Sequence, residues 1–188
     1  MKKCKGFTLV ELMVSITILA ILSAIVIPNF NEFVIKVRVD NEISQLHRLL
    51  LVARNSAINS NNNVTVCPLD NDLQCTTEWQ GTISVFIDNN NNDRLDTNIN
   101  ETVIRLKEAV KLGDKLQYGL RRFRLKYAPT GRTIGFGSNG TFKYCPKNYE
   151  DFARAIIVST SGRIYASSDI DNDGKDENRS GVEIICRN

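Results

Sequence analysis

The chain of 188 residues lacks the residue combinations on which most enzymes depend. It contains one histidine, no two cysteines separated by two residues, and none of the short motifs of serine hydrolases, phosphate-binding loops or zinc proteases. A histidine-based general base or a zinc centre is therefore not expected. These absences predict that the protein is not an enzyme.

The chain also lacks a large excess of charge of one sign. Its formal net charge is +3, and Lys2, Lys3 and Lys5 account for all of it, because the remaining chain has equal numbers of basic and acidic residues. A protein that binds nucleic acid through its overall positive charge is excluded. Only a local basic patch is compatible with this balance.

Cysteine is scarce but not absent. Cys4 lies among the basic N-terminal residues, and four more cysteines lie beyond an apolar run, at positions 67, 75, 145 and 186. An even number there predicts disulfides in an oxidising compartment. Cys67 and Cys75 enclose the short polar loop PLDNDLQ and are expected to pair, which leaves Cys145 for Cys186. The chain-entropy estimate for these two bridges is about 2.6 and 4 kcal/mol; the other two pairings stay open.

The only long apolar run extends from Phe7 to Ile27 and contains one charged residue, Glu11. As an α-helix these residues would be about 30 Å long, which matches the hydrocarbon core of a bilayer. A carboxylate in hydrocarbon is costly unless a partner neutralises it. A secretory signal peptide or a plain membrane anchor leaves Glu11 unexplained. Cys4 precedes the apolar run, which argues against a lipoprotein.

The sequence KGFTLVEL at residues 5–12 resembles the class III leader and cleavage motif of type IV pilins and type II secretion pseudopilins. The resemblance implies that prepilin peptidase cuts after Gly6 and that the new N-terminal residue, Phe7, is N-methylated. It also implies that Glu11 faces the N-terminal amine of a neighbouring subunit during assembly. Such a partner would remove the cost of the carboxylate. Pro28 stands where pilins commonly have a helix-kinking proline.

The rest of the chain predicts one more helical stretch and then a β-rich head. Apolar residues recur at intervals of three and four up to about Ser60, where the run SNNN ends the pattern. The residues of this stripe are Phe30, Phe33, Val34, Val37, Ile43, Leu46, Leu50, Ala53 and Ala57. Short runs rich in β-branched and aromatic residues follow, separated by turns, which predicts antiparallel strands.

These patterns divide the chain into four parts. We predict a leader peptide at residues 1–6, a transmembrane and assembly helix at 7–28, an amphipathic helix at 29–60, and a disulfide-containing globular head at 61–188. Strands are expected at 64–67, 82–87, 101–106, 116–127, 132–136, 140–145, 153–159, 163–167 and 182–186. The fold class is α+β: a pilin fold, in which a long N-terminal helix, membrane-spanning in its first half, packs on an antiparallel β-sheet head.

Three segments of the head narrow the resemblance. ARNSAI at residues 53–58, EWQGTISVFID at 78–88 and VSTSGRIY at 158–165 resemble the FimT/FimU and H-type pseudopilin group. This implies a minor type IV pilin that supports pilus assembly or a tip complex; an H-type pseudopilin of type II secretion is the alternative. The implied partners are other pilin subunits, contacted through the N-terminal helix, prepilin peptidase and the inner membrane. The head would lie in the periplasm before assembly into the fibre.

A DNA-binding pilin for natural transformation is the alternative from a different class. Basic residues gather in the middle of the head, at Arg121, Arg122, Arg124 and Lys126, with Phe123 and Tyr127 between and beside them. Such a surface could bind phosphates and stack on bases. In the FimT branch a late G-R-x-R turn contributes to DNA binding, and here Arg163 occupies its first arginine position while the second is Tyr165. Charges on a solvated strand face explain the same residues.

Calcium is the only cofactor that the sequence suggests. The stretch DIDNDG at 169–174 offers Asp169, Asp171 and Asp173 in the spacing of a calcium loop, although Ser180 stands where an EF-hand has its bidentate glutamate. A second stretch offers Asp88 followed by Asn90, Asn92 and Asp96. Polar β-turns favour the same residues and explain both stretches without a metal.

Overall fold

The structure is a computed structural model that describes residues 6–135 and 138–186, without the side chains of residues 25–29. The leader residues 1–5, Phe136 and the side chain of Pro28 therefore lie outside the described part. The chain divides into two compact units, Met1–Val37 and Arg38–Asn188. The first contains only the beginning of the long helix, and the second contains the head together with the rest of that helix.

One helix, α1 (Leu9–Ser60), forms the N-terminal third of the chain, as predicted. It ends where the polar run begins, and Asn61 directly after it has a positive φ of 54°. Asparagine tolerates this left-handed conformation better than most residues, because its short side chain can bond to the local backbone. The predicted end of the helix at Ser60 is confirmed.

The buried face of α1 begins at Val39. Val39, Ile43, Leu46, Leu49, Leu50, Ala53 and Ala57 are all buried. Their spacing of three and four residues places them on one stripe of the helix. Four residues that the sequence analysis put on the same stripe, Phe30, Phe33, Val34 and Val37, are instead 43–62% exposed. They belong to the N-terminal unit, so the stripe that the head covers is shorter than predicted.

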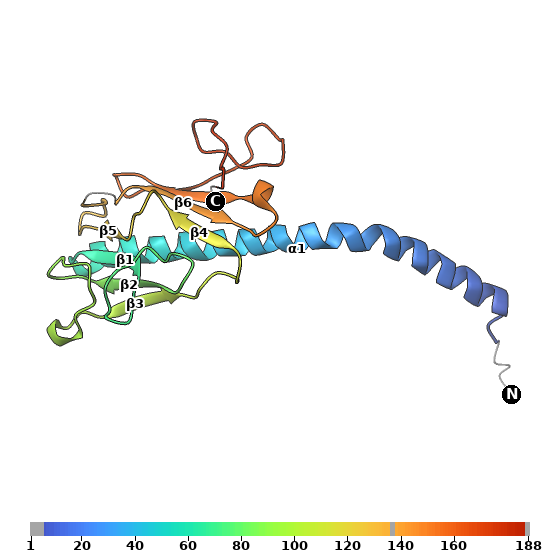
Figure 1. Cartoon of the computed structure of the whole chain (residues 1–188), viewed down its shortest axis with the longest axis horizontal. Helices are drawn as coiled ribbons and strands as arrows, with labels where there is room; N and C mark the ends of the chain where they lie inside the picture. The colour runs from blue at the N-terminus through green and yellow to red at the C-terminus, as the bar shows by residue number, and fades with distance from the viewer. Residues whose placement is uncertain (1–5, 136–137, 187–188) are drawn as a thin grey trace. The chain divides into compact units, whose positions relative to one another are not determined.

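The head contains two antiparallel sheets of four strands each. The first has the order β3-β2-β1-β5, formed by Val103–Lys107, Ile83–Ile87, Val64–Pro68 and Leu125–Tyr127. The second has the order β4-β6-β7-β8, formed by Lys115–Tyr118, Gly140–Cys145, Arg154–Val158 and Ile164–Ala166. In Figure 1 the second half of α1 runs alongside strands of both sheets. Short 3-10 turns at Thr97–Ile99 and Glu150–Phe152 lie in the connections.

Three predicted strands differ in the structure. The predicted strand at residues 116–127 is two strands in different sheets, β4 and β5, because Gly119 and Arg121 have positive φ and turn the chain between them. Of the predicted strands at 132–136 and 182–186, the described residues 132–135 and 182–186 form only isolated bridges, Tyr127 with Thr133 and Glu177 with Glu183. Both segments pair at single residues and do not extend a sheet.

Ion pairs tie α1 to the head at three places. Glu42 contacts Lys107 of β3 at 2.6 Å, Arg38 contacts Asp114 at 3.1 Å, and Arg154 of β7 contacts Asp40. Lys107 and Asp114 are buried, so removal of one partner would leave a charge in the interior without compensation. These pairs therefore specify where the two sheets sit along the second half of the helix.

An aromatic cluster joins the two sheets. Trp79, in the connection between β1 and β2, packs edge-on against Tyr118 of β4 and Phe142 of β6, with both pairs of ring centroids 5.1 Å apart. Tyr118 and Phe142 stack on each other at 4.0 Å. The indole N–H of Trp79 donates to the carbonyl oxygen of Arg122, which satisfies the only polar group of a side chain that is otherwise enclosed.

Two disulfides close the head. Cys67 pairs with Cys75 and Cys145 pairs with Cys186, the same pairs that we expected from the sequence. The second bridge holds the irregular C-terminal segment, which follows β8, against the end of β6. Ile184 of that segment packs with Cys145, Ala153 and Ala155. The segment between Ala166 and Cys186 is thus anchored at both ends, and its loop contains the acidic residues considered below.

Candidate functional site

The first turn of α1 contains Glu11 in a reciprocal cap with Thr8. The hydroxyl oxygen of Thr8 accepts the backbone N–H of Glu11 at 3.2 Å, and the Glu11 carboxylate accepts the backbone N–H of Thr8 at 2.9 Å and its hydroxyl at 3.0 Å. This is a capping box, which satisfies backbone donors that a helix start leaves without partners. Among the described residues, the carboxylate therefore bonds only to its own turn.

Other polar side chains of the same stretch bond within the helix. The hydroxyls of Ser15, Thr17 and Ser23 each donate to the carbonyl oxygen four residues earlier. This back-bonding removes hydroxyl groups from the helix surface. Among the described residues of α1 before Phe30, Glu11 carries the only charge.

The apolar side chains around Glu11 are exposed in the single chain. Eleven of them are more than half exposed: Phe7, Leu9, Val10, Leu12, Met13, Val14, Ile16, Ile18, Leu19, Ile21 and Leu22. Contiguous apolar surface of this extent marks an interaction site. Within the described residues, no helix combines the length and apolarity needed to cross a membrane. The predicted transmembrane segment, 7–28, includes residues 25–28, whose side chains lie outside that part.

Most of the predicted DNA-binding residues have protein partners. Arg124 contacts Asp93 at 2.5 Å, and the buried ammonium group of Lys126 contacts Asp88 and Asp93. Tyr127 is fully buried and cannot stack on a base; burial also raises the pKa of its hydroxyl above the ordinary value. The stacking role considered for Tyr127 is therefore wrong.

The remaining arginines lie in separate connections. Arg121 and Arg122 lie in the connection between β4 and β5. Arg121 is exposed, and the guanidinium of Arg122 lies 5.6 Å from the ring centroid of Tyr118 in β4. Arg163 is exposed in the turn between β7 and β8. DNA binding stays a prediction for Arg121, Arg122, Arg124 and Arg163. Arg124 already forms a salt bridge with Asp93.

The loop that follows Asp88 does not gather ligands for a metal. Asp88 is buried, with a carboxylate oxygen 2.9 Å from the ammonium group of Lys126 and bonded to the hydroxyl of Thr65. Asn90 and Asn92 donate their side-chain N–H groups to Asp96. The lysine supplies the positive charge here, so a calcium site at Asp88 is not supported.

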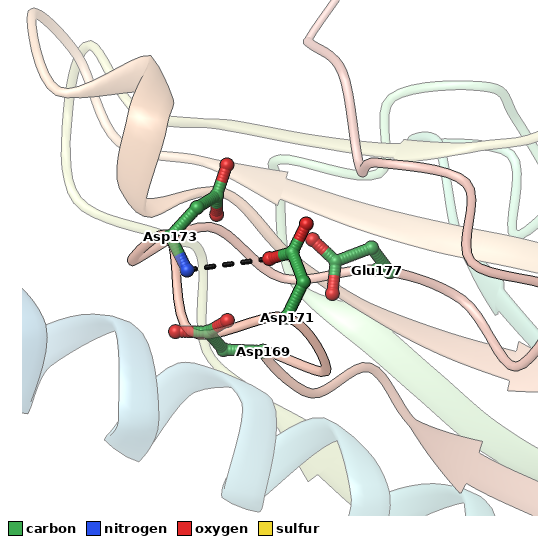
Figure 2. A group of neighbouring side chains, drawn as sticks. All are labelled: Asp169, Asp171, Asp173 and Glu177. Carbon is green, nitrogen blue, oxygen red and sulfur yellow. Dashed lines mark hydrogen bonds between the residues drawn. The ribbon is translucent and has the colours of Figure 1, made fainter.

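The second predicted loop gathers four carboxylates. Asp169, Asp171 and Asp173 offer oxygens that lie, together with one from Glu177, within 4.8 Å of one another. Figure 2 shows the carboxylate of Glu177 beside that of Asp171. Gly174 has a φ of +92°, which turns the chain back toward Glu177. Ser180, the position of an EF-hand's bidentate ligand, is not in the group.

Two residues of these sites were not identified from the sequence. Thr8 completes the cap of Glu11, and its T-x-x-E spacing is a recognised signal for a helix start. If Asp169 is counted as position 1 of the loop, Glu177 is position 9, and its carboxylate lies beside those of the three aspartates. The sequence analysis considered the bidentate ligand only at position 12, which is Ser180. The T-x-x-E spacing and Glu177 are both visible in the sequence, and a calcium site at this loop stays a prediction.

Comparisons with known proteins agree with the fold and the N-terminal motif. The family described as type II transport protein GspH matches residues 42–162, and the prokaryotic N-terminal methylation motif matches residues 1–27. Two curated fimbrial proteins of Pseudomonas aeruginosa are 36% identical over 58 residues, 31% of this chain. The chain spans 38% of the length of these relatives.

A solved structure has the same fold. The type IV minor pilin FimU of Pseudomonas aeruginosa superimposes with a TM-score of 0.57, at 15% identity, over 72% of this chain and 92% of that one. A second crystal form of FimU gives a TM-score of 0.51 at 16% identity, over 66% of this chain and 89% of that one. With the methylation motif at its start and the matched head, the chain belongs to the GspH family within the pilins and pseudopilins.

Proposed function

We propose that the chain is a minor pilin, which enters a type IV pilus fibre through α1 and contributes its head to the fibre surface or tip. The observation that carries the proposal is the position of Glu11. It is a charged group on a helix surface that is otherwise apolar and exposed. Such a surface needs a lipid or protein environment, and a carboxylate in that environment needs a partner.

The proposed assembly step exchanges one set of partners for another. Prepilin peptidase would cut after Gly6 in the inner membrane and methylate the new amino group of Phe7. In the single chain, Glu11 accepts hydrogen bonds from Thr8. On entry into the fibre, the charged amine of a neighbouring subunit would approach Glu11, and the ion pair in a low-dielectric setting would be stronger than the hydrogen bonds from neutral donors that it replaces.

A role as the H-type pseudopilin of type II secretion is a second candidate. The match to the GspH family over residues 42–162 favours it, while the likeness to the FimU fold is equally compatible with a pilus. We place the pilus first, because 58 residues of the chain also match fimbrial proteins. Both roles rest on the same helix and the same assembly chemistry.

Substitution of Glu11 tests the proposal. We expect Glu11→Val to leave leader cleavage intact and to reduce the amount of the protein in sheared pili strongly, because the variant lacks the charge that pairs with a neighbour's amine. Immunoblots of membrane and sheared fractions measure both steps. Wild-type amounts of Glu11→Val in sheared pili would contradict the proposal.

Two matched variants separate charge from helix capping. Glu11→Gln retains a side chain that completes a capping box but loses the charge, and we expect it to assemble as poorly as Glu11→Val. Thr8→Val removes the cap and keeps the carboxylate, and we expect it to assemble better than either. If Glu11→Gln assembled normally, Glu11 would serve the helix start and not the contact between subunits.

A further inference from the structure

We infer that the loop from Asp169 to Glu177 is a calcium site, in which Glu177 supplies the ligand that the aspartates alone lack. The site lies in the head, apart from the assembly helix, and is independent of the proposed role in a fibre. The four carboxylates come from one loop, which begins after β8 and ends where Glu177 bridges back to Ser168. Three features of this loop carry the inference.

The first feature is an oxygen of Glu177 that is buried without a partner. Glu177 is 4% exposed; its Oε2 accepts the backbone N–H of Ile170 at 2.7 Å, and its Oε1 has no hydrogen-bond partner among the described residues. Figure 2 shows this carboxylate directed at the aspartates of the loop. A buried carboxylate oxygen is costly when nothing bonds to it, so a cation at this point would remove the cost.

A second buried glutamate of the head provides the comparison. Glu101 is 3% exposed, and each of its two oxygens accepts a backbone N–H, from Asn89 and from Asp96, both at 2.8 Å. At Glu101 the backbone therefore supplies a partner for both carboxylate oxygens. Glu177 differs because one oxygen is left for a partner that is not part of the chain.

The second feature is the absence of a neutralising side chain. Among the described residues, no lysine or arginine forms a salt bridge with any of the four carboxylates. Lys175, within the loop, contacts Glu183 at 3.6 Å, and the guanidinium of Arg179 lies 3.5 Å from the ring centroid of Tyr165. In the loop after Asp88, by contrast, the ammonium group of Lys126 neutralises the carboxylate of Asp88. Four negative charges at this distance repel one another. A divalent cation among them would attract all four carboxylates and offset that repulsion.

The third feature is the number of carboxylates, which favours calcium over magnesium. The loop offers four carboxylates, and one oxygen from each lies within 4.8 Å of the others. Calcium takes six to eight oxygen ligands in a flexible geometry, whereas magnesium keeps several waters and is usually bound through one or two carboxylates. A group of four carboxylates on one loop therefore suits calcium better than magnesium.

Binding would stabilise the C-terminal segment of the head. Glu177 exchanges backbone hydrogen bonds with Ser168, and Asp176 accepts the backbone N–H of Ile184 through its carbonyl oxygen. The same segment ends at the disulfide between Cys186 and Cys145. An ion held by Asp169, Asp171, Asp173 and Glu177 would thus hold the loop between β8 and this disulfide in one conformation.

Titration of the full chain in detergent with calcium chloride, after treatment with a chelator, tests the site. We expect a single site with a Kd of about 10⁻⁴–10⁻³ M, as for other extracellular calcium modules, and a rise in the midpoint of thermal unfolding. Isothermal titration calorimetry measures the first quantity. Magnesium chloride at the same concentrations should bind about tenfold more weakly or not at all.

Asp171→Asn and Glu177→Gln should each weaken calcium binding about tenfold or more, because each removes a charged ligand. Asp171 is exposed, so its variant is expected to fold even if Glu177→Gln does not. Asp70→Asn is the matched control, since Asp70 is an exposed loop aspartate that accepts two backbone N–H groups, and it should bind as the wild type does. Absence of binding up to about 10 mM calcium, equal binding by magnesium, or unchanged binding in Asp171→Asn would overturn the inference.

Discussion

At the scale of single residues, the buried polar groups of the head differ in how completely they are hydrogen-bonded. Asp114 is buried and accepts hydrogen bonds from Arg38, Tyr144 and the backbone N–H of Lys147, so it joins helix, sheet and loop. Its contact also raises the pKa of the Tyr144 hydroxyl, with burial as the larger cause. Glu177, by contrast, retains an oxygen without a partner.

Tyr127 provides a test at this scale. Its buried hydroxyl has no hydrogen-bond partner among the described residues, and burial, followed by the nearby Tyr118, raises its pKa above the ordinary value of 10. Removal of a buried polar group that lacks a partner should stabilise the protein, so we expect Tyr127→Phe to increase the free energy of unfolding by about 1 kcal/mol at pH 7. Denaturant titration measures this change.

The same variant predicts the direction of the pH dependence. Because the pKa is raised in the folded state, the unfolded tyrosine loses its proton first, and the stability present below pH 10 is lost as the pH rises above 10. Tyr127→Phe should reduce this loss by up to about 1.4 kcal/mol per pH unit. Lower stability of Tyr127→Phe at pH 7 would show that the hydroxyl has a partner, and an unchanged slope above pH 10 would show that burial does not raise its pKa.

At the scale of elements, turns decide how the two sheets meet. The turn between β7 and β8 closes with the N–H of Gly162 donating to the carbonyl oxygen of Ser159. A Cβ on Gly162 would lie 1.9 Å from the carbonyl oxygen of Gly131, in the connection after β5 of the other sheet. The glycine of the S-x-G-R sequence therefore permits close contact between two turns, as well as a positive φ of 77°.

Gly162→Ala and Gly181→Ala form a matched pair at this scale. Both positions have a similar positive φ, but nothing lies within 4 Å of a Cβ at Gly181. We expect Gly181→Ala to cost about 1 kcal/mol, the conformational term alone, and Gly162→Ala to cost about 2–4 kcal/mol because the two turns must also separate. Thermal or denaturant unfolding measures the difference, and equal costs would show that the contact with Gly131 is not made.

At the scale of the whole molecule, charge balance bears on the choice between fibre component and DNA receptor. Outside the basic N-terminal residues the chain is formally neutral, and two members of the basic stretch, Arg124 and Lys126, are paired with aspartates. A DNA receptor would need several unpaired cations on one surface. The proposed assembly role needs only Glu11 and the exposed apolar surface around it.

Salt-dependent DNA binding tests this choice. We expect the full chain in detergent to bind duplex DNA weakly or not at all between about 50 and 200 mM salt, where three or four phosphate contacts would give a logarithmic slope of about −3. Electrophoretic mobility shift or fluorescence anisotropy measures the affinity. Nanomolar binding at physiological salt that Arg163→Gln abolishes, with the fold intact, would identify a DNA receptor.

Features carried by neighbouring residues were available from the sequence alone. The N-terminal motif, the extent of α1 and the D-x-D-x-D-G spacing depend on short separations, so local pattern predicts them. The disulfides were expected from the even number of cysteines in the head and from the short loop between Cys67 and Cys75. Tertiary structure decided what depends on distant partners. The division of residues 116–127 between two sheets, the pairing of Arg124 and Lys126 with Asp93, and the enclosure of Glu177 follow from which strands and loops pack together. Those contacts join residues far apart in the chain, and their burial sets the energy of each charge.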